Sequence, residues 1–128
     1  MQRQRTLVAA CYATAAIVIA TLHASAQSSP PPSYVAEPDV YKLLSENDQF
    51  RVILATWAPG KRDAWHSHAG ALTAYTLTAC KARFYTPDGK SIDRETPSGV
   101  ATFSPEVPSH SFENLGTTAC QALIVERK

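Results

Sequence analysis

The chain has 128 residues and a formal net charge of +1, from 12 lysine and arginine residues against 11 aspartate and glutamate residues. A chain of this length is expected to form one domain with a single small core. The balanced charge, without a basic patch, argues against a nucleic-acid partner.

The first 26 residues have the features of a secretory signal peptide. Arg3 and Arg5 give a positive start, an apolar run follows, and Ala24 to Ala26 fits the small-residue pattern of a cleavage site. We predict cleavage after Ala26 and a periplasmic or secreted mature protein without a stable membrane span. An N-terminal membrane anchor is the alternative, although the apolar run is near the lower length limit for crossing a bilayer.

Residues 27–39, QSSPPPSYVAEPD, are rich in proline and serine and predict an extended or disordered lead-in. From residue 40 onward, short β-branched and aromatic runs alternate with turn residues, and no convincing helical period appears. The expected strand-forming runs are residues 50–58, 72–79, 81–86, 100–104, 110–116 and 120–127. This spacing predicts an all-β domain over residues 40–128, as a sandwich or a barrel.

Cleavage after Ala26 would remove Cys11 and leave Cys80 and Cys120. An even number of cysteines in an exported protein favours a disulfide. Such a bond would close a loop of about 40 residues and contribute roughly 3–4 kcal/mol on the chain-entropy model. The alternative is a pair of buried thiols on separate strands.

Three of the four histidines lie in the predicted β domain, at His66, His68 and His110. Residues two apart on a strand point to the same face, so His66 and His68 would present two imidazoles side by side. With His110 as a third partner, they predict a divalent metal site with one to three positions open for water or substrate. The alternative is a buried polar cluster that holds no metal.

The spacing around these histidines resembles the two signature motifs of the cupin superfamily. The matching residues are Gly60, His66 and His68 in the first motif and Gly99, Pro105, His110 and Asn114 in the second, with Val107 where the family often has glycine. The segments NDQFRVILATWAPG, TPDGK and SHSFENLGTTACQALIVE also look like short single-domain cupins, some of them named β-alanine-degradation-type proteins, a name that transfers no function. The resemblance covers residues 40–128 and implies a small jelly-roll β-barrel with the metal inside.

One departure from the family pattern concerns the glutamate of the first motif, which should lie near Thr73. There is no acidic residue from Ala64 to Pro87. Glu106 lies in a turn, and Glu113 has the opposite strand parity to His110, so neither is a good substitute. The expected site is therefore three neutral histidines.

Three imidazoles leave the charge of a divalent ion uncompensated, which favours an anionic ligand. Lys61 and Arg62 could guide such a ligand, or could simply be solvated. By strand parity, Thr73 and Tyr75 are the polar catalytic candidates near the site, although a tyrosine at this position is more often part of a core.

The jelly-roll resemblance has further structural implications. The last strand would run antiparallel beside residues 72–79, so that Cys80 and Cys120 could face each other. The aromatic residues Trp57, Phe103 and Phe112 are expected to pack inside the barrel. A homodimer formed through sheet edges is an option that the sequence leaves open.

The sequence therefore suggests an exported cupin that acts on a small anionic or enolisable substrate with iron, zinc, manganese, nickel or copper. Its chemistry could resemble that of a dioxygenase, or could be isomerisation or hydrolysis. The alternative is a non-catalytic cupin that binds a small ligand or sequesters metal. The sequence decides neither the reaction nor the metal.

Overall fold

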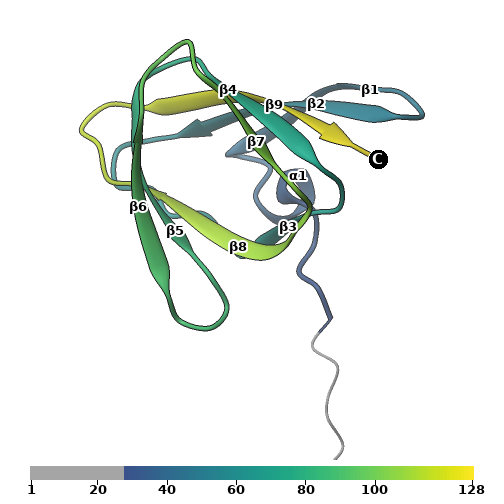
Figure 1. Ribbon diagram of the computed structural model, residues 1–128, viewed down its shortest axis with the longest axis horizontal. Helices are drawn as coiled ribbons and strands as arrows, with labels where there is room; N and C mark the ends of the chain where they lie inside the picture. The colour runs from purple at the N-terminus through teal and green to yellow at the C-terminus, as the bar shows by residue number, and fades with distance from the viewer. Residues whose placement is uncertain (1–27) are drawn as a thin grey trace, which may run out of the picture.

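The computed structural model describes residues 28–128, so the predicted signal peptide lies outside the described residues. These residues form two facing antiparallel sheets and one short helix (Figure 1). The elements are α1 (Ser33–Ala36), β1 (Tyr41–Glu46), β2 (Phe50–Trp57), β3 (His66–His68), β4 (Leu72–Thr76), β5 (Cys80–Tyr85), β6 (Ser91–Thr96), β7 (Ala101–Ser104), β8 (Val107–Asn114) and β9 (Cys120–Arg127). Within this part of the chain, no helix has the length and apolar character needed to cross a membrane.

The larger sheet has the strand order β1-β2-β9-β4-β7, and the smaller sheet has the order β3-β8-β5-β6. In Figure 1 the sheets lie opposite each other around the core, and the β1–β2 hairpin of the larger sheet extends beyond the smaller sheet. This arrangement confirms the all-β prediction. It also confirms that the last strand, β9, pairs antiparallel with β4.

Strand alternation explains which residues form the core. The buried residues of β9 are Cys120, Ala122, Ile124 and Glu126, which leaves the intervening positions partly exposed. Trp57 and Phe112 stack across the two sheets with ring centroids 4.0 Å apart, so their predicted packing role is confirmed. The same prediction for Phe103 is wrong, because its side chain is 86% exposed on the edge strand β7.

Strands β1 and β6 were not among the expected strand-forming runs. Both are edge strands, and five of the six residues in each are exposed or nearly so, which removes the alternating pattern that marks a half-buried strand. Strand β6 pairs with β5 along its whole length, and cross-strand ion pairs add to this pairing. Asp93 binds Arg83 at 2.6 Å, and Glu95 binds Lys81 at 3.2 Å.

The lead-in over residues 30–37 is packed against the domain and is not the expected tether. The backbone nitrogen of Ser67 donates to the Pro31 carbonyl at 3.0 Å, and its hydroxyl donates to the Pro30 carbonyl at 2.8 Å. Ser33 in α1 is fully buried. These contacts order the proline-rich segment, which covers the outer side of β3.

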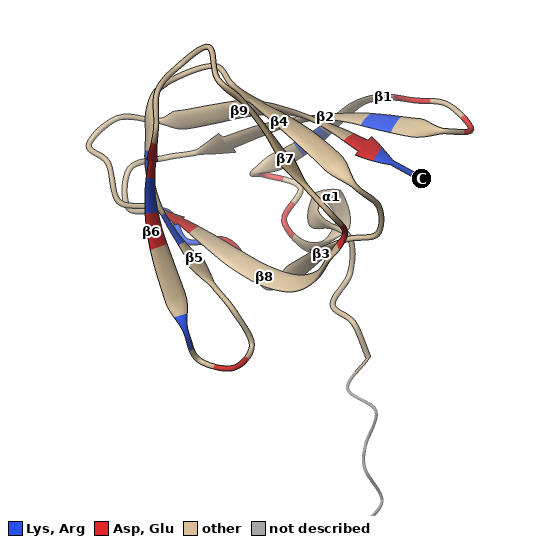
Figure 2. Ribbon diagram, in the orientation of Figure 1, with Lys and Arg blue, Asp and Glu red and all other residues tan. Residues whose placement is uncertain are grey.

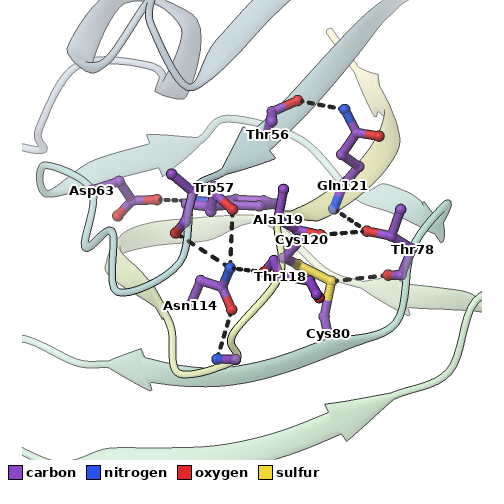
Figure 3. Close-up of a disulfide and its surroundings, with 12 residues drawn as sticks. Thr56, Trp57, Asp63, Thr78, Cys80, Asn114, Thr118, Ala119, Cys120 and Gln121 are labelled. Carbon is purple, nitrogen blue, oxygen red and sulfur yellow. Dashed lines mark hydrogen bonds between the residues drawn. A yellow bond between two sulfur atoms is a disulfide. The ribbon is translucent and has the colours of Figure 1, made fainter.

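The expected disulfide between Cys80 and Cys120 is present, with Cα atoms 5.0 Å apart (Figure 3). Its location differs from the expectation in one respect. Cys80 begins β5 in the smaller sheet, whereas Cys120 begins β9 in the larger sheet. The bond therefore joins the two sheets covalently at one end of the barrel, and does not link adjacent strands of one sheet.

Asn114 holds the turn beside the disulfide. Its side-chain nitrogen donates to the Trp57 carbonyl at 3.0 Å and to the Thr118 carbonyl at 2.8 Å, and its side-chain oxygen accepts from the Gly116 backbone nitrogen at 2.8 Å (Figure 3). Because Asn114 is buried, these bonds satisfy polar groups that would otherwise lie away from water.

Candidate metal centre

The three predicted histidines lie together between the sheets. Strand β3 carries His66 and His68, and it pairs with β8 so that His66 lies opposite His110. One ligand nitrogen from each ring lies within 4.8 Å of the other two. The side-chain directions expected from strand geometry are confirmed, since Ser67 points to the opposite side toward Pro30.

Hydrogen bonds to the first two histidines fix which ring nitrogen carries the proton. The Nδ1 atom of His66 donates to the Ala64 carbonyl at 2.9 Å, and the Nδ1 atom of His68 donates to Glu126 Oε2 at 2.8 Å. Each ring therefore keeps Nε2 unprotonated and able to bind a metal ion. His110 Nε2 is buried and has no hydrogen-bond partner among the described residues. An unsatisfied buried nitrogen beside two unprotonated ones fits a metal site.

Glu126 supplies a carboxylate that the sequence analysis missed. Its side chain is buried next to His68, and its other oxygen lies 3.5 Å from Arg51 Nη1. It is not one of the three mutually close ligands, so it acts on the site through His68. A carboxylate bonded to the outer nitrogen of a metal-binding histidine orients the ring and raises its basicity.

Asp63 organises the other side of the cluster. Its carboxylate accepts hydrogen bonds from the Tyr41 hydroxyl at 2.7 Å, from Trp57 Nε1 at 2.9 Å and from the Phe112 backbone nitrogen at 2.7 Å. The Tyr41 oxygen also lies 3.1 Å from His66 Nε2. This buried network fixes the ring of His66 from β1, β2 and β8 together.

Burial keeps His66 and His110 neutral. Burial, followed by repulsion from His66 and His68, lowers the pKa of His110 to about 3. Burial also lowers the pKa of His66, and Asp63 partly opposes this effect. Tyr41 stays protonated, because burial and the charge of Asp63 raise its pKa well above the ordinary value. Neutral imidazoles are the form that binds metal.

The overall fold is shared with solved structures of known class. A cupin domain from Bordetella pertussis Tohama I superposes with a TM-score of 0.65 at 22% identity, over 77% of this chain and 96% of that chain. This chain has the cupin fold. A cupin family protein with a double-stranded β-helix fold from Methanocaldococcus jannaschii gives a TM-score of 0.57 at 10% identity, over 69% of this chain and 78% of that chain.

A third similar structure is a conserved protein with a double-stranded β-helix domain from Klebsiella pneumoniae, with a TM-score of 0.56 at 19% identity, over 69% of this chain and 75% of that chain. No protein-family model matches the sequence, and no curated protein matches it. The likeness to known proteins therefore concerns the fold.

A cavity of about 420 Å³ opens beside the histidine cluster, within the cupin barrel. His68 and His110 line it, whereas His66 is fully buried behind them. A second depression, of about 490 Å³, lies around Phe50, Thr73 and Phe103 and has no histidine in its wall. Chemistry at the metal centre would therefore take place in the first cavity.

Thr73 and Tyr75 do not face this cavity, so the strand parity behind their selection is wrong. The β4 residues that line it are Leu72, Ala74 and Thr76. Thr73 donates its hydroxyl to the Thr102 carbonyl at 3.1 Å, and Tyr75 is 45% exposed. The register explains the outcome, because Leu72 lies opposite the inward-facing Glu126 on β9.

Lys61 and Arg62 are also absent from the cavity wall, so neither contacts a ligand bound there. Lys61 forms an ion pair with Glu37 at 2.8 Å. The Arg62 side chain donates to Ser111 Oγ at 3.0 Å and lies 3.6 Å from the ring centre of Tyr85. Both residues hold loops of the cupin barrel together.

Changing Glu126 to glutamine is expected to weaken metal binding by roughly 10–100-fold without abolishing it, as for other partners that orient a metal-binding histidine. The amide oxygen can still accept the hydrogen bond from His68, but the negative charge is lost. Competition with a chromophoric chelator measures the change. The matched control is Glu113→Gln, since Glu113 accepts a hydrogen bond from Tyr85 and is not among the cavity-lining residues. Equal affinities of the two variants would contradict the role given to Glu126.

The metal-free protein should become less stable as the pH falls below about 6.5, the ordinary pKa of histidine. Between that value and the folded-state pKa of about 3, His110 binds a proton in the unfolded chain but not in the folded chain. Proton binding to His110 in the unfolded chain should lower the free energy of unfolding by roughly 2 kcal/mol between pH 6.5 and pH 5. Urea unfolding of chelator-treated protein at both pH values measures this loss. Between the same two pH values, the variant His110→Gln should lose roughly 2 kcal/mol less stability than the wild type. The same pH dependence in the variant and the wild type would contradict the prediction.

Proposed function

We propose that this protein binds a divalent metal ion through His66, His68 and His110 and uses it to bind and transform a small molecule in the adjacent cavity. The observation that carries the proposal is the buried, unpartnered Nε2 of His110 within reach of two other histidine nitrogens. When bound, such an ion would act as a Lewis acid toward an oxygen of the substrate.

The residues of the chain have separate tasks in this proposal. His110 is neutral across the physiological pH range because its pKa is about 3, so it can donate a lone pair without first losing a proton. Glu126 and Asp63 orient His68 and the His66–Tyr41 pair. The apolar wall formed in part by Phe84, Phe112 and Ile124 limits water around the substrate.

The alternative is a non-catalytic cupin that binds a ligand or stores metal. One observation favours it: no aspartate or glutamate is among the residues that line the cavity. A reaction that needs a carboxylate as general base is therefore poorly served. Oxygen activation, isomerisation and hydrolysis that depend mainly on a metal ion remain compatible with this lining.

The proposal is tested by elemental analysis of protein purified without added metal, followed by activity measurements. About one metal ion per chain is expected. Protein reloaded with iron, manganese, nickel, copper or zinc is then assayed for oxygen consumption with small diketones and thiols. A bound metal without turnover of any substrate class would favour the non-catalytic alternative, and absence of metal under every condition would contradict the proposal.

We also propose that the protein is exported and that cleavage follows Ala26. The sequence features of residues 1–26 support this, and so does the disulfide between Cys80 and Cys120, since disulfides persist in oxidising compartments. Mass spectrometry of the protein recovered from a periplasmic or culture-medium fraction would test it. A chain that retains residues 1–26 in the cytosol would contradict it.

A further inference from the structure

Arg94 is a charged residue in the wall of the cavity that contains the histidine cluster. It lies at the centre of β6, opposite Ala82 of β5. The three β6 residues that line the cavity are Ile92, Arg94 and Thr96, as strand alternation requires. Because β6 is an edge strand and Arg94 is exposed, its guanidinium lies where the cavity meets solvent.

The acidic neighbours of Arg94 do not neutralise it. Asp93 and Glu95 alternate with Arg94 along β6 and pair with Arg83 and Lys81 on β5. Figure 2 shows this alternation of acidic and basic positions along the strand. Among the described residues, no carboxylate lies within ion-pairing distance of Arg94.

Apart from Arg94 and the histidines, no acidic or basic side chain lines the cavity. The rest of the lining combines apolar side chains such as Leu72, Phe84 and Ile124 with a few hydroxyls, including those of Thr76 and Thr102. The histidines lie on β3 and β8 and Arg94 lies on β6, so β5 with its cavity-lining residues Ala82 and Phe84 separates them in the smaller sheet. The cavity volume of about 420 Å³ is within the range of small-molecule sites.

Arginine is suited to this position because its planar guanidinium can bind both oxygens of a carboxylate. The Arg94 guanidinium carbon lies 5.8 Å from the ring centre of Phe84, a contact that holds the side chain against the cavity wall. Neither Lys61 nor Arg62 could take this role, since both are held elsewhere.

We propose that Arg94 binds the carboxylate of a small ligand whose apolar body fills the cavity and whose opposite end reaches the metal held by the histidines. The ligand class is a monocarboxylate with an apolar middle and a metal-binding oxygen pair. The proposal rests on the metal-binding function proposed above. It assigns recognition of an anionic ligand to Arg94 inside the cavity and not to Lys61 or Arg62.

The test uses zinc-loaded protein, because zinc is redox-inert, and catechols as probes that chelate the metal. Calorimetry compares neutral 4-methylcatechol with 3,4-dihydroxybenzoate, 3,4-dihydroxyphenylacetate and 3-(3,4-dihydroxyphenyl)propionate, which place a carboxylate at increasing distance. At least one carboxylate probe is expected to bind about tenfold more tightly than 4-methylcatechol, since a charge-assisted bidentate contact is among the strong hydrogen bonds.

In the Arg94→Gln variant this preference should disappear, while 4-methylcatechol affinity stays within about twofold, because the variant removes one charge–carboxylate contact. The matched control is Arg83→Gln, which removes the same charge from the neighbouring strand but from a residue outside the cavity lining. It should retain the preference.

Persistence of the preference in Arg94→Gln would overturn the inference, and so would its absence from the wild type or a failure of every probe to bind loaded protein. Zinc content is measured in each sample. A protein that takes up no zinc contradicts the metal-binding function itself, whereas a zinc-loaded protein without carboxylate preference contradicts the role of Arg94 alone.

Discussion

Replacing His110 with alanine should yield a folded protein that no longer retains metal. The wild type is expected to carry about one ion per chain. Loss of an outer partner of a metal ligand already costs about 10–100-fold in affinity, so loss of a ligand should cost more than about 100-fold. Elemental analysis after gel filtration measures the metal that each protein keeps.

The fold should survive this substitution because His110 Nε2 makes no hydrogen bond within the described domain. Removing it therefore leaves no new polar group of the protein without a partner. Circular dichroism and thermal unfolding of the metal-free variant check this point. A variant that unfolds would be replaced in the test by His110→Gln, which keeps more of the side-chain volume and leaves the bond between His68 and Glu126 intact.

Thr73→Ala is the matched control for the histidine variant. Thr73 faces away from the cavity and bonds the Thr102 carbonyl, so its loss should leave the metal content unchanged. A His110→Ala protein with the metal content of the wild type would contradict the three-histidine site. Loss of metal in Thr73→Ala would instead show that the assignment of β4 side chains to the two faces is wrong.

Much of the site could be predicted because it depends on local spacing. His66 and His68 are two residues apart on one strand, so their shared direction follows from the backbone alone. The approach of His110 came from the resemblance to cupins, because the pairing between β3 and β8 joins His66 to a residue 44 positions later in the chain. The disulfide followed from counting cysteines, whereas its location between two sheets required the topology.

The missed carboxylate had a signal that was present in the sequence. On β9, Cys120, Ala122 and Ile124 alternate as inward residues, and the next inward position is Glu126. A search for a glutamate near Thr73 overlooked it, because partners on different strands need not be close in sequence. Leu72 lies opposite Glu126, so the carboxylate comes from the strand beside the expected one.

Arg94 could not be assigned from sequence for a different reason. The segment Ser91–Thr96 has one apolar residue, so it pairs with β5 without a hydrophobic pattern that would mark it as a strand in the sequence. Because the sequence does not predict this strand, it does not show which of its residues point inward. Thr73 and Tyr75 failed for the related reason that an error of one residue in register reverses every side chain of a strand.

Removal of the disulfide is expected to cause the largest loss of stability among the changes considered. The sequence separation of 40 residues between Cys80 and Cys120 corresponds to about 4 kcal/mol on the chain-entropy model. For a domain of this size the unfolding midpoint should fall on the order of 15–30 °C. The test compares the double variant Cys80→Ala, Cys120→Ala with the wild type by urea and thermal unfolding.

The metal centre should respond much less to this change than the stability does. The disulfide crosses one end of the barrel, whereas the histidines are positioned by β3 and β8 through hydrogen bonds with Ala64, Glu126 and the Asp63 network. At a temperature where the double variant remains folded, its metal content should match that of the wild type. Wild-type protein reduced with a phosphine should reproduce the stability of the variant. A midpoint change of less than about 4 °C, equivalent to under about 1 kcal/mol, would contradict the stabilising role assigned to the bond.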